Sequence, residues 1–140
     1  MKRMIFAVSL ALISVGLALC VPAATAQNQE QVKPVFEHAI PNVENKSMVA
    51  VLVTYPPGGK SLAHHHAPSS FIYAYVVSGA IRSQVNGEPV KVYNAGEGFY
   101  EVPGSSHRIS ENASDKNPAT LLAVFVVDSK DQPLTIPDQK

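Results

Sequence analysis

Gly58 to His66 reads Gly-Gly-Lys-Ser-Leu-Ala-His-His-His, and the interpretation of the whole chain depends on this stretch. It follows Pro56 and Pro57, which together with the two glycines predict a turn. The residues from Phe71 to Val77 are mostly aromatic or β-branched, so they are expected to form a strand. The histidines therefore lie between a predicted turn and a predicted strand.

Alternation along an extended backbone would give the three histidines different directions. Successive side chains of a strand point to opposite faces, so His64 and His66 share one face and His65 points to the other. Two neutral imidazoles on one face can bind one first-row metal ion. A solvated histidine-rich loop without a ligand is the alternative that this stretch alone leaves open.

Residues 1–26 have the pattern of a secretory signal peptide. Lys2 and Arg3 precede an apolar run from Ile5 to Val21, and Ala24-Thr25-Ala26 forms a small-residue cleavage signal before Gln27. The run is short for a membrane-spanning helix. We therefore expect an exported protein, periplasmic or secreted, whose mature chain contains no membrane span.

Cysteine content and charge narrow the classes of partner. Cys20 is the only cysteine and precedes the cleavage signal, so no disulfide can form within the mature chain. Lipidation of Cys20 is a further alternative. Lipidation signals have a small residue directly before the cysteine, however, and this chain has Leu19 there. The chain has 11 Lys and Arg against 11 Asp and Glu and no basic stripe, which argues against nucleic acid. A small-molecule ligand or substrate is favoured, and a homodimer is left open.

The rest of the chain reads as short strands separated by Gly and Pro. We expect residues 27–46 to be an N-terminal extension, residues 47–128 to be one domain and residues 129–140 to be a loosely packed tail. No helical period follows the signal, so the prediction is an all-β barrel or sandwich. Besides the histidine segment, the expected strands are Met48–Tyr55, Phe71–Val77, Ala80–Val85, Val90–Tyr93, Phe99–Val102, His107–Glu111 and Ala119–Val127.

A second motif contains a single histidine after a Pro-Gly turn. Gly96 to Asn112 reads Gly-Glu-Gly-Phe-Tyr-Glu-Val-Pro-Gly-Ser-Ser-His-Arg-Ile-Ser-Glu-Asn. Together the two stretches resemble the two motifs of the cupin superfamily, over about Met48 to Val127. Pro103 and Asn112 each stand one place later than in the family pattern. The residues that fit the two motifs are Gly58, His64, His66 and Gly79, followed by Gly96, Gly104 and His107.

The resemblance implies a single jelly-roll β-barrel with a metal held inside one end by three histidines and a glutamate. The chain departs from the family pattern at that glutamate. Counting back from Gly79 puts Ile72 in its place, and counting forward from His66 puts Ser70 or Phe71 there. A metal bound by histidines alone, a metal-free barrel and a carboxylate from elsewhere are the three alternatives.

Glu101 is the candidate for a carboxylate from elsewhere. Alternation puts Glu101 on the same face as Phe99, which belongs inside the barrel. An inward carboxylate is costly unless it is paired or bound to a metal. A Glu101 that faces water on a strand edge is the competing interpretation. The expected metal site is therefore His64, His66, Glu101 and His107.

These residues predict a site for one divalent transition metal, because a mixed nitrogen and oxygen set suits Fe, Mn, Ni, Cu or Zn. The resemblance implies a metal-dependent enzyme acting on a small molecule, of oxygenase, isomerase or lyase type, with catalytic residues left unassigned. The alternatives are a non-catalytic module that binds a metal or small ligand and a metal-free structural barrel. Tyr73, Tyr75 and Tyr100 are expected in the core or barrel wall, and His38 on the surface.

Overall fold

The computed structural model describes residues 29–139, and every regular element in this range is a β-strand. The proposed signal peptide at residues 1–26 lies outside the described residues. Within the described range no helix is long and apolar enough to cross a membrane. The ten strands are β1 (Gln31–Ala39), β2 (Lys46–Tyr55), β3 (His64–His66), β4 (Phe71–Ser78), β5 (Ala80–Val85), β6 (Lys91–Asn94), β7 (Gly98–Glu101), β8 (Ser106–Asn112), β9 (Ala119–Asp128) and β10 (Thr135–Pro137).

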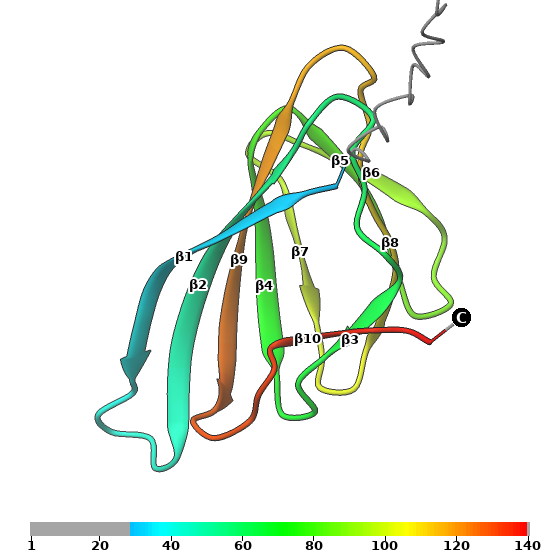
Figure 1. Ribbon diagram of the computed structural model, residues 1–140. Coiled ribbons are helices and arrows are strands. Elements are labelled where there is room, and N and C mark those ends of the chain that lie inside the picture. The colour runs from blue at the N-terminus through cyan, green and yellow to red at the C-terminus, as the bar shows by residue number, and fades with distance from the viewer. Residues whose placement is uncertain (1–28, 140) are drawn as a thin grey trace, which may run out of the picture.

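The strands form two five-stranded antiparallel sheets (Figure 1), with the orders β1-β2-β9-β4-β7 and β10-β3-β8-β5-β6. Only β1 and β2, and β5 and β6, are successive strands of the same sheet, and every other connection from β2 to β10 crosses from one sheet to the other. These crossings build an antiparallel sandwich closed into a barrel. The prediction of an all-β jelly roll is confirmed.

Alternation along the strands builds the core between the sheets. In β9, Ala119, Leu121, Ala123, Phe125 and Val127 are buried, whereas the residues between them are partly exposed. β4 follows the same period, and so does β2 except at Ala50, which is buried between Val49 and Val51. Full burial of a Leu, Val, Ile or Phe side chain contributes about 1.5–3 kcal/mol, so these three strands carry much of the stability.

The two ends of the described chain are more ordered than the sequence indicates. The expected extension contains β1, an edge strand paired with β2, and its register shifts at a bulge between Pro34 and Phe36. Proline lacks a backbone donor but is tolerated at edges and bulges. Because Pro34 argues against a strand in the sequence, β1 was not predicted. The expected tail contains β10, which pairs Thr135 with His66 and Pro137 with His64.

The three tyrosines are not core residues. Ile72, Ala74 and Val76 are the inward residues of β4, so Tyr73 and Tyr75 point outward and are 48% and 37% exposed. Tyr100 of β7 pairs with Tyr73 of β4 and is 64% exposed. The three tyrosines lie in the barrel wall, one of the two expected positions, and not in the core, because Ile72 and its alternate neighbours take the inward positions.

Asn112 ties the end of β8 to the surrounding loops. It is buried, and its amide group donates to the carbonyls of Pro56 and Asn117 at 3.0 and 2.8 Å. Its side-chain oxygen accepts from the Ser114 backbone amide at 2.9 Å. We expect Asn112→Ala to lower the free energy of unfolding by about 2 kcal/mol in urea titrations, because buried partners lose their hydrogen bonds. Asn117→Ala, at an exposed position of the same loop, is the control and should change stability little.

Candidate metal centre

Strand β3 lies between β10 and β8, and this pairing sets the direction of its three histidines. His64 pairs directly with His107 of β8, so both side chains point to the same face. Both are buried, at 7% and 3% exposure. His65 points the opposite way and its Nδ1 contacts the carboxylate of Asp138 on the exposed side. The alternation predicted from the sequence is therefore present.

His64, His66 and His107 form one cluster inside the barrel. One ring nitrogen from each lies within 4.8 Å of the others. The ring centroids of His64 lie 4.8 Å from His66 and 5.1 Å from His107. Nitrogens bound to one ion at about 2.1 Å lie roughly 3–3.5 Å apart, so modest side-chain movement would bring the three onto one ion.

Backbone carbonyls orient two of the three rings. His64 Nδ1 donates to the Leu62 carbonyl at 2.7 Å, and His66 Nδ1 donates to the Leu134 carbonyl at 3.0 Å. The Nε2 atom of each ring is thereby left as the acceptor that can face a metal. Burial lowers the pKa of His64 to about 4, against the opposing effect of the Leu62 hydrogen bond. The ring is therefore neutral at pH 7, as ligation requires.

Two side chains, and no backbone carbonyl, orient the His107 ring among the described residues. Its Nε2 lies 2.9 Å from Ser83 Oγ, and its Nδ1 lies 3.1 Å from Glu101 Oε1. Ser83 is buried on β5, with 3% exposure. Sequence analysis missed Ser83, and its only signal there is a small polar residue at an inward position of a strand. Within this arrangement, Nδ1 of His107 is the nitrogen on the side of Glu101.

Glu101 points into the barrel and is 3% exposed, so the solvent-facing alternative is wrong. Its Oε2 lies 3.7 Å from His66 Nε2 and has no hydrogen-bond partner among the described residues. Burial alone would raise the pKa of Glu101, but the adjacent imidazoles of His107 and His66 lower that pKa to about 2. An ionised, buried carboxylate with a free oxygen beside three imidazoles is a donor set that fits a divalent transition metal.

Register explains how Glu101 comes to lie beside the histidines. Ile72, which stands where the family pattern has its glutamate, pairs directly with Glu101 across β4 and β7. Both side chains are buried, so both point into the barrel. Directly opposed residues have Cβ atoms about 4.5–5.5 Å apart. The carboxylate is therefore displaced by one strand and stays at the same level of the barrel.

A cavity of about 190 Å³ opens onto the cluster. One side of it carries the three histidines with Ser110 from the β3 and β8 side, and the other side is the inner face of β2, β9 and β4. The hydroxyl of Tyr55, which also lines the cavity, is held by Ser110 and Ser61 at 2.7 and 2.9 Å. The histidines therefore face a small, partly apolar space that could hold a ligand.

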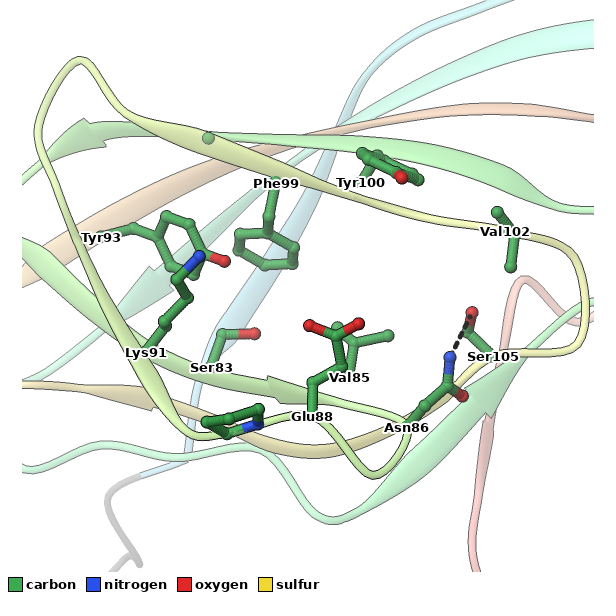
Figure 2. A pocket seen from close by; sticks show the side chains of 12 residues that line it. Ser83, Val85, Asn86, Glu88, Lys91, Tyr93, Phe99, Tyr100, Val102 and Ser105 are labelled. Carbon is green, nitrogen blue, oxygen red and sulfur yellow. Dashed lines mark hydrogen bonds between the residues drawn. The ribbon is translucent and has the colours of Figure 1, made fainter.

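A second cavity of about 420 Å³ lies between the β5–β6 hairpin and β7 (Figure 2). None of the three histidines lines it, but Ser83 and Phe99 do. These two residues also contact His107, Ser83 through the hydrogen bond and Phe99 through its ring at 5.7 Å. Ser83 therefore separates this cavity from the histidine cluster.

Replacing Ser83 by alanine is expected to lower metal affinity by about tenfold, because partners that orient a ligating histidine typically contribute 10–100-fold. Competition with a metal-binding dye measures the dissociation constant. Ser83→Thr keeps the hydroxyl and should retain near-parental affinity. Parental affinity in Ser83→Ala would show that the hydroxyl does not position His107.

Comparison with known proteins agrees with this architecture. A search of curated proteins finds no match. A Klebsiella pneumoniae protein with a double-stranded β-helix domain is similar in structure at 19% identity, with a TM-score of 0.61, over 83% of this chain and 90% of that one. An oxalate oxidase in complex with glycolate is similar at 22% identity and a TM-score of 0.60, over 81% of this chain and 57% of that one.

A Bacillus subtilis oxalate decarboxylase variant is similar at 28% identity and a TM-score of 0.52, over 64% of this chain and 23% of that one. The sequence model of the cupin domain matches residues 51–125. That range contains His64, His66, Glu101 and His107 and runs from β2 to β9. The match covers more than half of the chain, which therefore belongs to the cupin family.

Proposed function

We propose that this cupin is a metal-dependent enzyme that acts on a small molecule, with one metal ion held by His64, His66, His107 and Glu101. The observation that carries the proposal is the buried Oε2 of Glu101, which has no hydrogen-bond partner within residues 29–139 and lies beside His66 Nε2. A buried charge of this kind needs a cation close by. A bound divalent ion would supply it.

The chain's own residues divide the work at this centre. Glu101 would offset part of the positive charge of the ion, and the carbonyls of Leu62 and Leu134 hold two imidazoles in the ligating tautomer. The ion, when bound, would supply Lewis acidity or oxygen activation. The apolar inner face of β2, β9 and β4 would limit water around the substrate. The similarity to an oxalate oxidase and an oxalate decarboxylase supports an enzyme that acts on a small molecule, without assigning the substrate.

Elemental analysis of protein purified without a histidine tag tests the metal proposal. About one ion of Fe, Mn, Ni, Cu or Zn per chain is expected. Protein that contains no transition metal after purification, and takes up none when each ion is added, would contradict the proposal. A non-catalytic metal-binding module is the second candidate. Two carboxylates line the cavity among the described residues, and since Glu101 is assigned to the ion, Glu30 is the one left to take part in catalysis. Metal-loaded protein with no turnover would favour that candidate.

We further propose that the protein is exported, to the periplasm or the medium, and that the mature chain begins at Gln27. The support is the charged start, the apolar run and Ala24-Thr25-Ala26 in the sequence. The intact mass of the protein recovered after export should correspond to residues 27–140. A mass that includes a lipid on Cys20 would replace this proposal by a lipoprotein.

A further inference from the structure

We infer that the barrel cavity selects small, uncharged and largely apolar molecules over dicarboxylates such as oxalate. The inference deepens the proposed function and rests on it for the position of the metal. It is carried by the composition of the cavity wall, the charges around the cavity and the cavity's size.

The wall opposite the histidines is continuous and apolar. It is formed by three neighbouring strands of one sheet, β2, β9 and β4. Each contributes inward residues at alternate positions, and across the sheet these side chains adjoin one another. A ligand that offers one donor atom to the metal would therefore press the rest of its surface against hydrocarbon. The wall residues are Val51, Val53, Leu121, Ala123, Phe125, Ile72 and Ala74.

The charges around the cavity disfavour an anion with a second carboxylate. Among the described residues that line it, none is Lys or Arg, and the two charged ones are Glu30 and Glu101. One carboxylate of oxalate could approach the ion. The other would lie against the apolar wall without a cation beside it, where an unpaired charge is strongly disfavoured. An uncharged apolar group in the same place gains from burial.

The size of the cavity limits the ligand further. Pockets for drug-sized ligands usually measure about 300–1,000 Å³, and this one measures about 190 Å³. A single aromatic ring or a short aliphatic chain with one polar atom fits this volume. Phenol is therefore a suitable probe, and oxalate is its charged counterpart.

Calorimetric titration of phenol and of oxalate into metal-loaded and metal-free protein tests the inference. We expect phenol to bind at least tenfold more tightly than oxalate to the loaded protein, and still to bind the metal-free protein. Oxalate binding that equals or exceeds phenol binding would overturn the inference while leaving the metal centre standing. Phenol binding to a protein that never takes up metal would leave the cavity inference standing and contradict the proposed function.

A gain-of-binding variant makes the charge argument independent of any loss of folding. Val32 lines the cavity from β1 and is 57% exposed, so Val32→Arg adds a cation at the rim without disturbing the core. Val32→Arg should raise oxalate affinity at least threefold and leave phenol affinity within twofold. Val92→Arg is the control, at a 49% exposed position of β6 that does not line the cavity. Equal oxalate affinity in both variants would overturn the charge argument.

A second inference rests on a separate observation, the outer face of the sheet β1-β2-β9-β4-β7. Register places one uncharged row across all five strands, and a second row runs beside it from Met48 through Val126 to Phe71. Phe36, Phe71, Tyr73, Tyr75 and Tyr100 on this face are between 37% and 64% exposed. Exposed apolar patches of this extent are unusual on monomers. The five-residue row is Phe36, Ala50, Val124, Tyr73 and Tyr100.

We propose that a second copy of this chain covers the face. The five strands have 9, 10, 10, 8 and 4 residues. At a spacing of about 4.8 Å and about 3.3 Å per residue they span roughly 650 Å², which is within one partner's share of a standard interface, about 600–1,000 Å². The centre carries no charge that self-packing would repel, and the Lys46–Asp128 ion pair, at 2.7 Å, lies at its margin. A two-fold arrangement would place the same patch on both partners.

Sedimentation equilibrium over a hundredfold range of concentration tests this second proposal. A dimer is expected. Tyr73→Asp and Tyr100→Asp should each raise its dissociation constant at least a hundredfold. Val92→Asp, on an exposed strand of the other sheet, should leave the constant unchanged. Thermal denaturation confirms that each variant folds. A parent protein that is monomeric at every concentration would overturn the proposal. The face would then be free, or covered by another part of the chain or by a different partner.

Discussion

Replacement of His66 by alanine is expected to remove most of the bound metal, whereas replacement of His65 should leave metal binding unchanged. The two residues are neighbours on a three-residue strand, yet His66 joins the cluster with His64 and His107 and His65 contacts Asp138 outside the barrel. Loss of a direct ligand should weaken binding by more than about 100-fold, the upper end of what loss of a supporting residue costs.

The measurement is the metal dissociation constant of each variant, with the metal content after dialysis as a second reading. His65→Ala is a matched control, because it removes an imidazole from the same strand without removing a ring from the cluster. An equal loss in both variants would mean that the histidine run binds metal as a flexible tract. No loss in either would remove His66 from the site.

Glu101→Gln should weaken metal binding at least tenfold, which corresponds to about 1.4 kcal/mol at 25 °C. Glutamine keeps the shape of the side chain but lacks the charge that would offset the cation. The alternative site has three histidines and water. It predicts parental affinity in Glu101→Gln together with a large loss in His107→Ala.

Exchanging Glu101 and Ile72 gives a sharper form of the same test. Glu101→Ile alone should lose affinity as strongly as Glu101→Gln or more. Adding Ile72→Glu should restore it to within about tenfold of the parent, because directly opposed Cβ atoms lie only about 4.5–5.5 Å apart. Dye competition measures all three proteins, and circular dichroism checks their folding. A double variant as weak as Glu101→Ile would show that the carboxylate does not act as a ligand from either strand.

Local patterns in the sequence predict the central strands well. The expected Ala80–Val85 is β5, and the other central strands agree within two residues at either boundary. Alternation also places His64, His65, His66 and Glu101 on the faces where the structure has them. Each of these inferences depends only on neighbours within a few residues, which is the range over which a period of two can be read.

Features that depend on distant partners could not be read in this way. β1 and β10 are strands because β2 and β3 pair with them, and their own residues show no clear alternation. Ser83 matters because β5 and β8 bring its hydroxyl to His107. The tyrosines of β4 and β7 resemble core residues in composition, and the choice between the two faces of those strands depends on the opposite sheet.

The short strand β10 has a consequence for how fast a bound ion could leave. It has three residues, lies at the edge of its sheet, and directly follows Leu134, whose carbonyl holds His66. Short edge elements open locally at far less free energy than the whole fold requires. Release of β10 would free the His66 ring while β2, β9 and β4 remained packed. Ion exchange would then be governed by fraying at one edge, and its rate could differ widely between variants of equal global stability.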